Sequence, residues 1–272
     1  MSIDDKYQRY FLSDKKCIAY FSHKASFKYW DDLWKNNNLE KIIKNSGSNY
    51  FETFIRKYLK ERSTILEGGC GQGKIVYSLM KYGYNTIGID FAPEIVNEVN
   101  KIVPEIDIRY GDVRNLPIKD STIDGYVSGG VIEHFWDGYD EIMKEMYRVL
   151  KVGGFLFISF PFMSTIRRIK VKRNIFPIKN SSELKGKKNT FYQFALDENI
   201  VIKHFTNNGF TLVNYEYIDG IKGFKDEIGL FSSPLQKIYD GDLKIKYYHL
   251  LDKLLSKISG HVILLIFKKN KK

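Results

Sequence analysis

The residues with the clearest chemical potential form a glycine-rich turn that begins with a carboxylate. The stretch reads Thr64-Ile-Leu-Glu-Gly-Gly-Cys-Gly-Gln-Gly-Lys74, so Glu67, Gly69, Gly71 and Gly73 alternate with other residues. A short apolar run precedes the turn, and an apolar pattern of helical period follows it. A strand, a tight turn and a helix open the nucleotide-binding α/β folds, where glycine lets a ligand approach bare backbone. The turn therefore predicts a ligand site.

Three kinds of ligand site compete for this turn. A dinucleotide motif, read from Gly69, would need glycine where Lys74 stands. A phosphate loop would need a hydroxyl residue where Ile75 stands, and that hydroxyl is the Mg²⁺ ligand. The third pattern, a carboxylate and three alternating glycines, is complete, and the carboxylate of Glu67 would repel a bound phosphate. A P-loop-type nucleotide hydrolase remains an alternative at this point.

Further polar or glycine residues follow later strands of the predicted sheet. Asp90 and Phe91 follow the strand predicted at 86–90, Asp112 and Val113 follow the one at 106–110, and Gly129 and His134 follow the one at 123–128. Because the carboxyl ends of parallel strands meet at one edge of a sheet, these residues are expected to gather beside the glycine turn.

In this order, the motifs resemble those of the class I S-adenosylmethionine-dependent methyltransferases, in particular the small-molecule group similar to the ubiquinone/menaquinone-biosynthesis enzymes. The resemblance covers about residues 60–160, although Gly68 stands where an aliphatic residue is usual. It rests on these motifs: Leu66-Glu-Gly-Gly-Cys-Gly-Gln-Gly73, Gly88-Ile-Asp90, Gly111-Asp112-Val113 with Leu116-Pro117, Asp124-Gly-Tyr-Val-Ser128 through Val131-Ile-Glu-His134, and Arg148-Val-Leu-Lys-Val-Gly-Gly154.

The resemblance implies S-adenosyl-L-methionine as cofactor and S-adenosyl-L-homocysteine as product. Asp90 would accept the two ribose hydroxyls, and Asp112 and the Val113 N–H would meet the adenine. Glu67 would face the methionine amino group, directly or through water. The complete set of cofactor residues expected from the motifs is Glu67, Gly69, Gly71, Gly73, Asp90, Phe91, Asp112, Val113 and Gly129.

Methyl transfer is an in-line displacement at an activated carbon, so the protein mainly aligns the acceptor with the methyl group. His134 is expected in the transfer pocket, either as a general base or as a residue that fixes its loop. His204 is a candidate for a second polar contact, with an ordinary helix-surface histidine as the alternative. The Asn/Asp-Pro-Pro-Tyr signature of DNA N-methyltransferases is replaced by Ser128-Gly-Gly-Val. O- or C-methylation is therefore favoured, and no metal is expected.

The elements that must position these residues alternate between strand and helix from 64 to 160, which predicts a Rossmann-like α/β fold with a seven-stranded, mostly parallel sheet. We expect a helical cap or lid at 1–60 and a methyltransferase domain at 61–272. The domain would carry an insertion at about 161–190 and a cap segment at about 219–258. Tyr29, Trp30 and Trp34 are candidates for a lid over the ligand, and ordinary packing is the alternative.

The insertion is rich in lysine and arginine. It is either a solvated basic loop or a lid in which Arg167 and Arg168 bind an acidic substrate. Together with the aromatic N-terminal region, it suggests a small-molecule acceptor with a ring or an acidic group. A non-catalytic protein that keeps the cofactor fold as a scaffold is a further alternative.

The composition of the chain indicates which partners and which cellular compartment to expect. The 272 residues carry a net charge of +11, but the lysines are scattered without a basic-aromatic motif, so a nucleic-acid partner is not expected. Two distant cysteines, Cys17 and Cys70, and a polar N-terminus favour a cytoplasmic protein. The longest apolar run, 262–267, is too short to span a bilayer.

Overall fold

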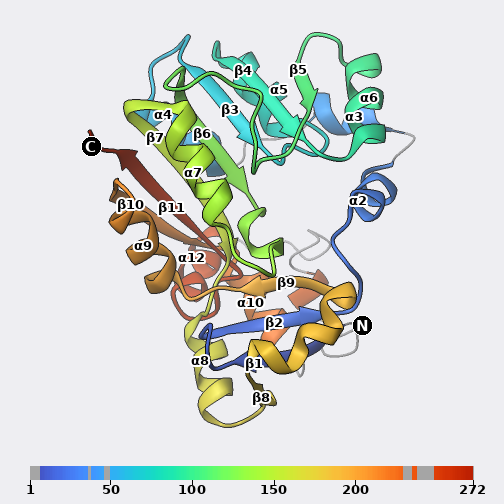
Figure 1. Cartoon of the computed structure of the whole chain (residues 1–272), viewed down its shortest axis with the longest axis vertical. Helices are drawn as coiled ribbons and strands as arrows, with labels where there is room; N and C mark the ends of the chain where they lie inside the picture. The colour runs from blue at the N-terminus through green and yellow to red at the C-terminus, as the bar shows by residue number, and fades with distance from the viewer. Residues whose placement is uncertain (1–6, 36–37, 46–49, 229–234, 238–247, 272) are drawn as a thin grey trace.

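The computed structural model describes residues 7–35, 38–45, 50–228, 235–237 and 248–271, and it is dominated by a seven-stranded sheet (Figure 1). The strand order is β10-β11-β7-β6-β3-β4-β5. The strands β3 to β7 run parallel to one another, and β11 is antiparallel to both β7 and β10. The strands are β3 (Thr64–Gly68), β4 (Asn85–Asp90), β5 (Asp107–Tyr110), β6 (Ile123–Gly129), β7 (Leu150–Pro161), β10 (Phe210–Ile218) and β11 (Val262–Lys269). The predicted α/β fold with a seven-stranded, mostly parallel sheet is confirmed.

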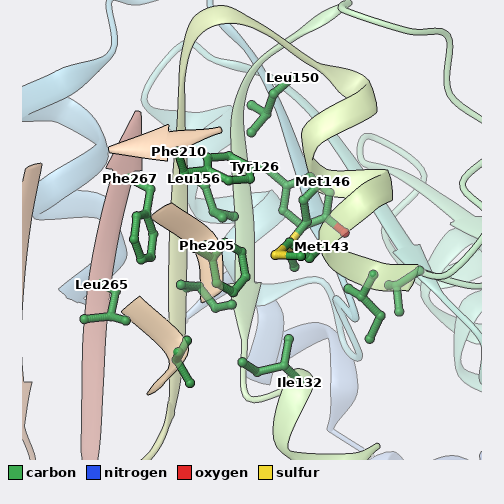
Figure 2. Close-up of a cluster of buried hydrophobic side chains, with 14 of the residues drawn as sticks. Tyr126, Ile132, Met143, Met146, Leu150, Leu156, Phe205, Phe210, Leu265 and Phe267 are labelled. Carbon is green, nitrogen blue, oxygen red and sulfur yellow. The ribbon is translucent and has the colours of Figure 1, made fainter. Parts of the chain in front are cut away.

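Helices cover both faces of this sheet. Alternate residues of β7 point to opposite faces, as the two-residue period of a strand requires. Leu156 packs with residues of α7 and α9 on one face, whereas Phe157 packs with Phe51 of α4 on the other. Figure 2 shows the first of these clusters, where Met143, Met146 and Phe205 meet the sheet. The flanking helices are α3 (Leu39–Lys44), α4 (Tyr50–Tyr58), α5 (Lys74–Lys81), α6 (Pro93–Ile102), α7 (Asp140–Val149) and α9 (Glu198–Asn207).

A second, four-stranded sheet corrects the prediction of an all-helical N-terminal region. Residues 8–21 form the hairpin β1 (Gln8–Leu12) and β2 (Cys17–Phe21), not helix. β1 pairs with β8 (Ile178–Lys179) and β2 with β9 (Phe191–Ala195), both from the segment after β7. All five residues of β2 are buried, because side chains cover both faces of the small sheet. The insertion predicted at 161–190 thus continues to β9 and joins the N-terminal hairpin in one sheet (Figure 1).

The segments around this sheet are largely helical. The helix α2 (Phe27–Trp34) follows the hairpin, as the sequence predicted, and α8 (Thr165–Lys172) and η2 (Ser181–Thr190) lie between β7 and β9. Of the cap segment predicted at 219–258, the structure describes α10 (Gly220–Glu227) and most of the length of α12 (Tyr248–Ser259), while 229–234 and 238–247 lie outside the described residues. Among the residues described, no helix has both the length and the apolar character that a membrane span requires.

Candidate active site

A cavity of about 560 Å³ opens at the carboxyl ends of the central parallel strands. Loops after β3, β4, β5 and β6 contribute to it, and the segment Lys24–Trp34 closes one side. From β3 the chain continues to β4 and β5 on one side and then crosses to β6 on the other side of β3, so the cavity lies at the switch point of the sheet, where open α/β folds bind ligands. Its size is that of a small-molecule or cofactor site, roughly 300–1,000 Å³.

The glycine loop after β3 is held against the end of β4. The N–H groups of Gly69 and Cys70 donate to the carbonyl of Ile89, at 2.7 and 3.1 Å. Gly69 and Gly71 have φ angles of +77° and +50°, a region that favours glycine, and both line the cavity. These two glycines are therefore where the sequence placed them.

Asp90 ends β4 at the floor of the cavity. Its Oδ2 accepts from the Gly71 N–H at 2.8 Å and its Oδ1 from the Ala92 N–H at 2.9 Å. Burial raises the pKa of the Asp90 carboxyl, and these backbone donors oppose that rise. Each oxygen keeps lone-pair capacity for a hydroxyl from a ligand, because a carboxylate offers about four acceptor positions.

Two residues expected at the cofactor do not line the cavity. Gly73, with φ of +70°, is the N-cap of α5, and a Cβ there would press on Ile106 and Ile108. Glu67 is buried, and its Oε2 has no hydrogen-bond partner. Burial and the charge of Asp90 raise the pKa of Glu67 well above its usual range. Neither residue lines the cavity, and the contact expected between Glu67 and the cofactor, directly or through water, stays a prediction.

The end of the cavity beyond β5 is formed by Phe91, Asp112, Val113, Arg114 and Phe135, of which the sequence predicted the first three. Asp112 is paired with Arg114, whose Nη2 lies 2.6 Å from Oδ2. The hydrogen bond from Arg114 lowers the pKa of the Asp112 carboxyl. The Arg114 guanidinium also lies 5.6 Å from the Phe135 ring centroid. This end carries two phenylalanine rings and one charged pair.

Two of the three predicted lid aromatics line the cavity. Trp30 and Trp34 stack on each other with ring centroids 5.7 Å apart, and Gln72 donates to the Trp34 carbonyl at 3.0 Å. Their helix α2 is fixed to α6, because the buried Asp31 carboxylate accepts from the Ile95 N–H at 3.0 Å. Tyr29 is not part of the lining; its ring stacks on His23 at 4.2 Å.

His134 lies in the cavity wall at η1 (Ile132–His134), between the two sheets. Its Nδ1 is 2.7 Å from the carbonyl oxygen of Tyr192 on β9. A carbonyl only accepts, so Nδ1 carries the proton and Nε2 keeps a free lone pair. Burial lowers the pKa of His134 to about 4, although the Tyr192 carbonyl favours the protonated form. Edge-on contact with Trp30, at 5.1 Å, completes its surroundings.

The predicted acceptor residues outside the N-terminal segment are not in the cavity. Arg167 is 1% exposed and pairs with Glu227 at 2.8 Å. Arg9 and Lys170 pair with the same buried carboxylate, so Arg167 belongs to an interior ion-pair network. Arg168 pairs with Asp197 and Glu198 at 2.8 and 2.7 Å. His204 on α9 pairs with Asp140 at 2.8 Å. All three have structural partners, and none lines the cavity.

The sequence analysis missed Lys24, Phe27, Gly130 and Phe135, which all line the cavity. Gly130, with φ of +70°, stands beside the predicted Gly129, so the paired glycines were a usable signal. Lys24 had no such signal, because only the path of the chain after β2 brings it there. Among the described residues that line the cavity, Lys24 is the one cation without an ion-pair partner.

Part of the chain matches a known protein family. Residues 66–158 match the family described as a methyltransferase domain. A probable S-adenosylmethionine-dependent methyltransferase of Mycolicibacterium smegmatis is 36% identical over 97 residues, which are 36% of this chain and 37% of that protein. Over these residues the chain is similar to S-adenosylmethionine-dependent methyltransferases. The cavity described above lies at its strand ends, and Gly69, Asp90, Asp112 and Gly129 fall inside the matched range.

Other relatives of the domain differ in their acceptors. A demethylmenaquinone methyltransferase of Lactobacillus johnsonii is 30% identical over 128 residues, 43% of this chain and 51% of that protein. A probable tRNA methyltransferase 9B of Bos taurus is 36% identical over 109 residues, 38% and 23%. The chain thus spans about half or less of the length of these relatives.

The fold likeness extends further than the sequence likeness. The Haloferax volcanii methyltransferase solved in complex with the Trm112 activator has a TM-score of 0.58 and 14% identity, over 92% of this chain and 100% of that chain. At this identity the likeness speaks for the fold alone.

Proposed function

We propose that the protein transfers a methyl group from S-adenosylmethionine to a small-molecule acceptor, with oxygen or carbon as the methylated atom. The observation that carries this proposal is the single cavity in which the glycine loop, the buried carboxylate of Asp90 and the imidazole of His134 meet. The relative that acts on demethylmenaquinone supports the finer assignment to the ubiquinone/menaquinone-like group.

The cofactor would lie across the strand ends. Asp90 has acceptor capacity for the two ribose hydroxyls, since each oxygen holds one backbone N–H. The methionine part would follow Gly69 and Gly71, and the adenine would lie between Phe91 and Val113. Asp112 would meet the adenine amino group while Arg114 keeps its carboxylate charged. The bound cofactor would supply an activated methyl group to the cavity that His134 also lines.

The acceptor would occupy the part of the cavity beneath the N-terminal segment. Phe27, Trp30 and Phe135 supply aromatic surface there, and Lys24 supplies a positive charge. This environment suits an aromatic acceptor with a carboxylate or a similar acidic group. The proposed cation is Lys24, in place of the arginines that the sequence suggested.

His134 would remove the acceptor proton through Nε2. The Tyr192 carbonyl fixes the ring and its tautomer, so the lone pair is available. A base with a pKa near 4 works best on an acceptor that loses its proton easily, because proton transfer depends on matched pKa values. A phenol, which is far less acidic than this imidazolium, would give its proton to Nε2 only as the methyl group is transferred, when the acidity of the phenol oxygen rises. The alignment of the acceptor with the methyl group would supply the rest of the rate enhancement, since effective molarities of well-oriented groups reach roughly 10⁵–10⁸ M.

The test begins with the purified protein and S-adenosylhomocysteine in a thermal-shift assay. We expect stabilisation by the nucleoside in the wild type and its loss in Asp90→Ala, while ATP with Mg²⁺ has no effect. Stabilisation by ATP–Mg²⁺ alone would favour the nucleotide hydrolase. Unchanged behaviour of Asp90→Ala in binding and in transfer would favour a non-catalytic scaffold.

The second arm identifies the acceptor class. S-adenosylmethionine with a labelled methyl group is offered with hydroxybenzoates, with quinols and with bulk tRNA. Label transfer to an aromatic acid or a quinol that depends on His134 supports the proposal. Label transfer to tRNA alone would contradict the small-molecule assignment.

A further inference from the structure

The helix α12 buries two serines and exposes three of its large apolar residues. Ser256 and Ser259, which face the protein, are 2% and 0% exposed. Leu250 and Leu254 are each 58% exposed, and Ile258 is 50% exposed. Residues four apart share a face of a helix, so the three large side chains form one outward apolar stripe. A helix that only completed a core would have the opposite distribution.

The close approach of α10 explains the small buried face. A Cβ on Gly220 would overlap the backbone at Ser256, and one on Gly223 would overlap the backbone at Ser259. Ser259 Oγ also donates to the Gly220 carbonyl at 2.9 Å. There is no room for leucine between the two helices, so the outward position of the apolar stripe follows from this packing.

A row of positive charge runs beside the apolar stripe. Lys253 and Lys257 are exposed and stand three residues after Leu250 and Leu254, on the neighbouring helix face. Asp252, the acidic residue within α12, accepts from the Ile221 N–H at 2.9 Å on the inner side. The helix α8, which contacts α12, ends at the exposed Lys172 and is followed by the exposed Arg173.

The edge of the sheet beside α12 also combines aromatic and charged side chains. Tyr215 on β10 is half exposed and lines a hollow of about 510 Å³ that it shares with Lys253 and Lys257. Glu216 is the carboxylate in that lining. Tyrosine and lysine are residues that lie at the headgroup level of a membrane, where one end of the side chain is apolar and the other is wet.

We propose that the exposed face of α12 docks the protein peripherally on an anionic lipid surface. Leu250, Leu254 and Ile258 would enter the boundary between headgroups and acyl chains, while Lys253 and Lys257 would contact acidic headgroups. A second copy of the chain fits this face less well, because a two-fold contact brings the two lysine rows together. The net charge of +11 favours the same occupant. The inference is independent of the proposed methyl transfer.

The experiment is co-sedimentation of the whole chain with vesicles of phosphatidylcholine, with and without phosphatidylglycerol. We expect binding to the anionic vesicles alone, weakened by salt. The triple variant Leu250→Ser/Leu254→Ser/Ile258→Ser and the double variant Lys253→Gln/Lys257→Gln should each lose affinity on the order of tenfold or more. The matched control Val152→Ser, at an exposed apolar residue on β7, should bind as the wild type does.

Three outcomes would overturn the proposal. Equal binding to both kinds of vesicle, or no binding by the wild type, contradicts an anionic lipid partner. A large fall in melting temperature of the triple variant shows that the stripe packs within the chain. A change from dimer to monomer in light scattering of the triple variant, without vesicle binding by the wild type, assigns the stripe to a second copy.

Discussion

The phenol of Tyr126 on β6 occupies the space that a side chain at Gly68 on β3 would need. A Cβ built on Gly68 would lie 2.8 Å from Cζ of Tyr126 and nearer still to its oxygen. Tyr126 is fully buried, and its hydroxyl has no hydrogen-bond partner. The aromatic ring on β6 therefore fills the space beside β3 that a side chain at Gly68 would otherwise occupy. This relationship explains a glycine at a position where the family resemblance predicted an aliphatic residue.

Gly68→Ala should destabilise the protein by roughly 1–3 kcal/mol, the usual cost of overpacking a core. Tyr126→Phe should cost little or stabilise, because it removes an unpartnered buried hydroxyl. In the double variant the cost of the alanine should fall, since the closest overlap is with the oxygen. Urea unfolding of the four proteins gives the coupling. Additive effects would show that the two residues do not compete for space.

The sequence predicted most of the large sheet because its signals are local. A run such as 86–90 ends in a carboxylate and is followed by a helix, and the structure places strand, loop and helix within a residue or two. The small sheet had no local signal. β1 pairs with β8, more than 160 residues later, and β2 is buried on both faces, so its pattern does not alternate.

The residues of the site also differ in whether a local sequence signal predicts their position. Asp90 and Gly71 were predictable because a motif fixes their place relative to one strand end. Arg167 and Arg168, the candidate substrate ligands, have carboxylate partners and do not line the cavity, because a basic run does not show which of its charges are paired within the protein. Lys24 was missed because its place depends on the hairpin before it.

Arg167 and Arg168 should differ in their effect on stability. Burial alone would raise the pKa of Glu227, but Arg167, Arg9 and Lys170 lower it to about 2. Glu227→Gln or Arg167→Gln leaves buried charge without its partner and should cost roughly 3–5 kcal/mol. Arg168→Gln removes a half-exposed pair and should cost about 1 kcal/mol or less. Denaturant unfolding measures both. If Arg167→Gln and Arg168→Gln lowered the free energy of unfolding equally, the buried ion pairs of Glu227 would not be the main stabilising part of this network.

The same carboxylate predicts acid sensitivity. The folded pKa of Glu227 is depressed, so its contribution to stability is present above the unfolded pKa near 4.5. That contribution is lost as the pH falls toward 2. Wild type should lose more stability than Glu227→Gln over this window, as followed by circular dichroism. Parallel acid profiles would show that another group controls the transition.

Glu133 should act in the opposite sense. It is buried beside His134, its Oε2 has no hydrogen-bond partner, and burial raises the pKa of its carboxyl to about 8. The folded state then binds more protons than the unfolded state between about pH 4.5 and 8, so stability falls as the pH rises. Glu133→Gln should remove this slope and raise the melting temperature most at pH 8. A difference between the two proteins that stays constant from pH 5 to 8 would contradict a neutral carboxyl.

His134→Gln should lower kcat by roughly 10²–10⁴ if Nε2 is the base, with unchanged affinity for S-adenosylhomocysteine. Because the pKa of His134 is lowered to about 4, the rate should stay level from pH 6 to 8 and fall as the pH approaches 4. The folded state also binds fewer protons there, so stability falls over the same range. Rates at fixed pH with a stability control separate the two effects. A rate that rises through pH 6.5 would indicate a histidine of ordinary pKa.

Lys24→Met should raise the KM for an acidic aromatic acceptor and leave S-adenosylhomocysteine binding unchanged. Lys24 lines the same cavity as Phe27, and methionine nearly keeps the length of the lysine side chain while removing its charge. The expected loss is on the order of tenfold or more in kcat/KM, because a charge-assisted hydrogen bond contributes about 1.5–3 kcal/mol. Lys24→Arg should recover part of this loss. Lys28→Met, four residues further on α2 and outside the lining, is the matched control. If Lys24→Met instead weakens S-adenosylhomocysteine in calorimetry, the cation serves the methionine carboxylate and not the acceptor.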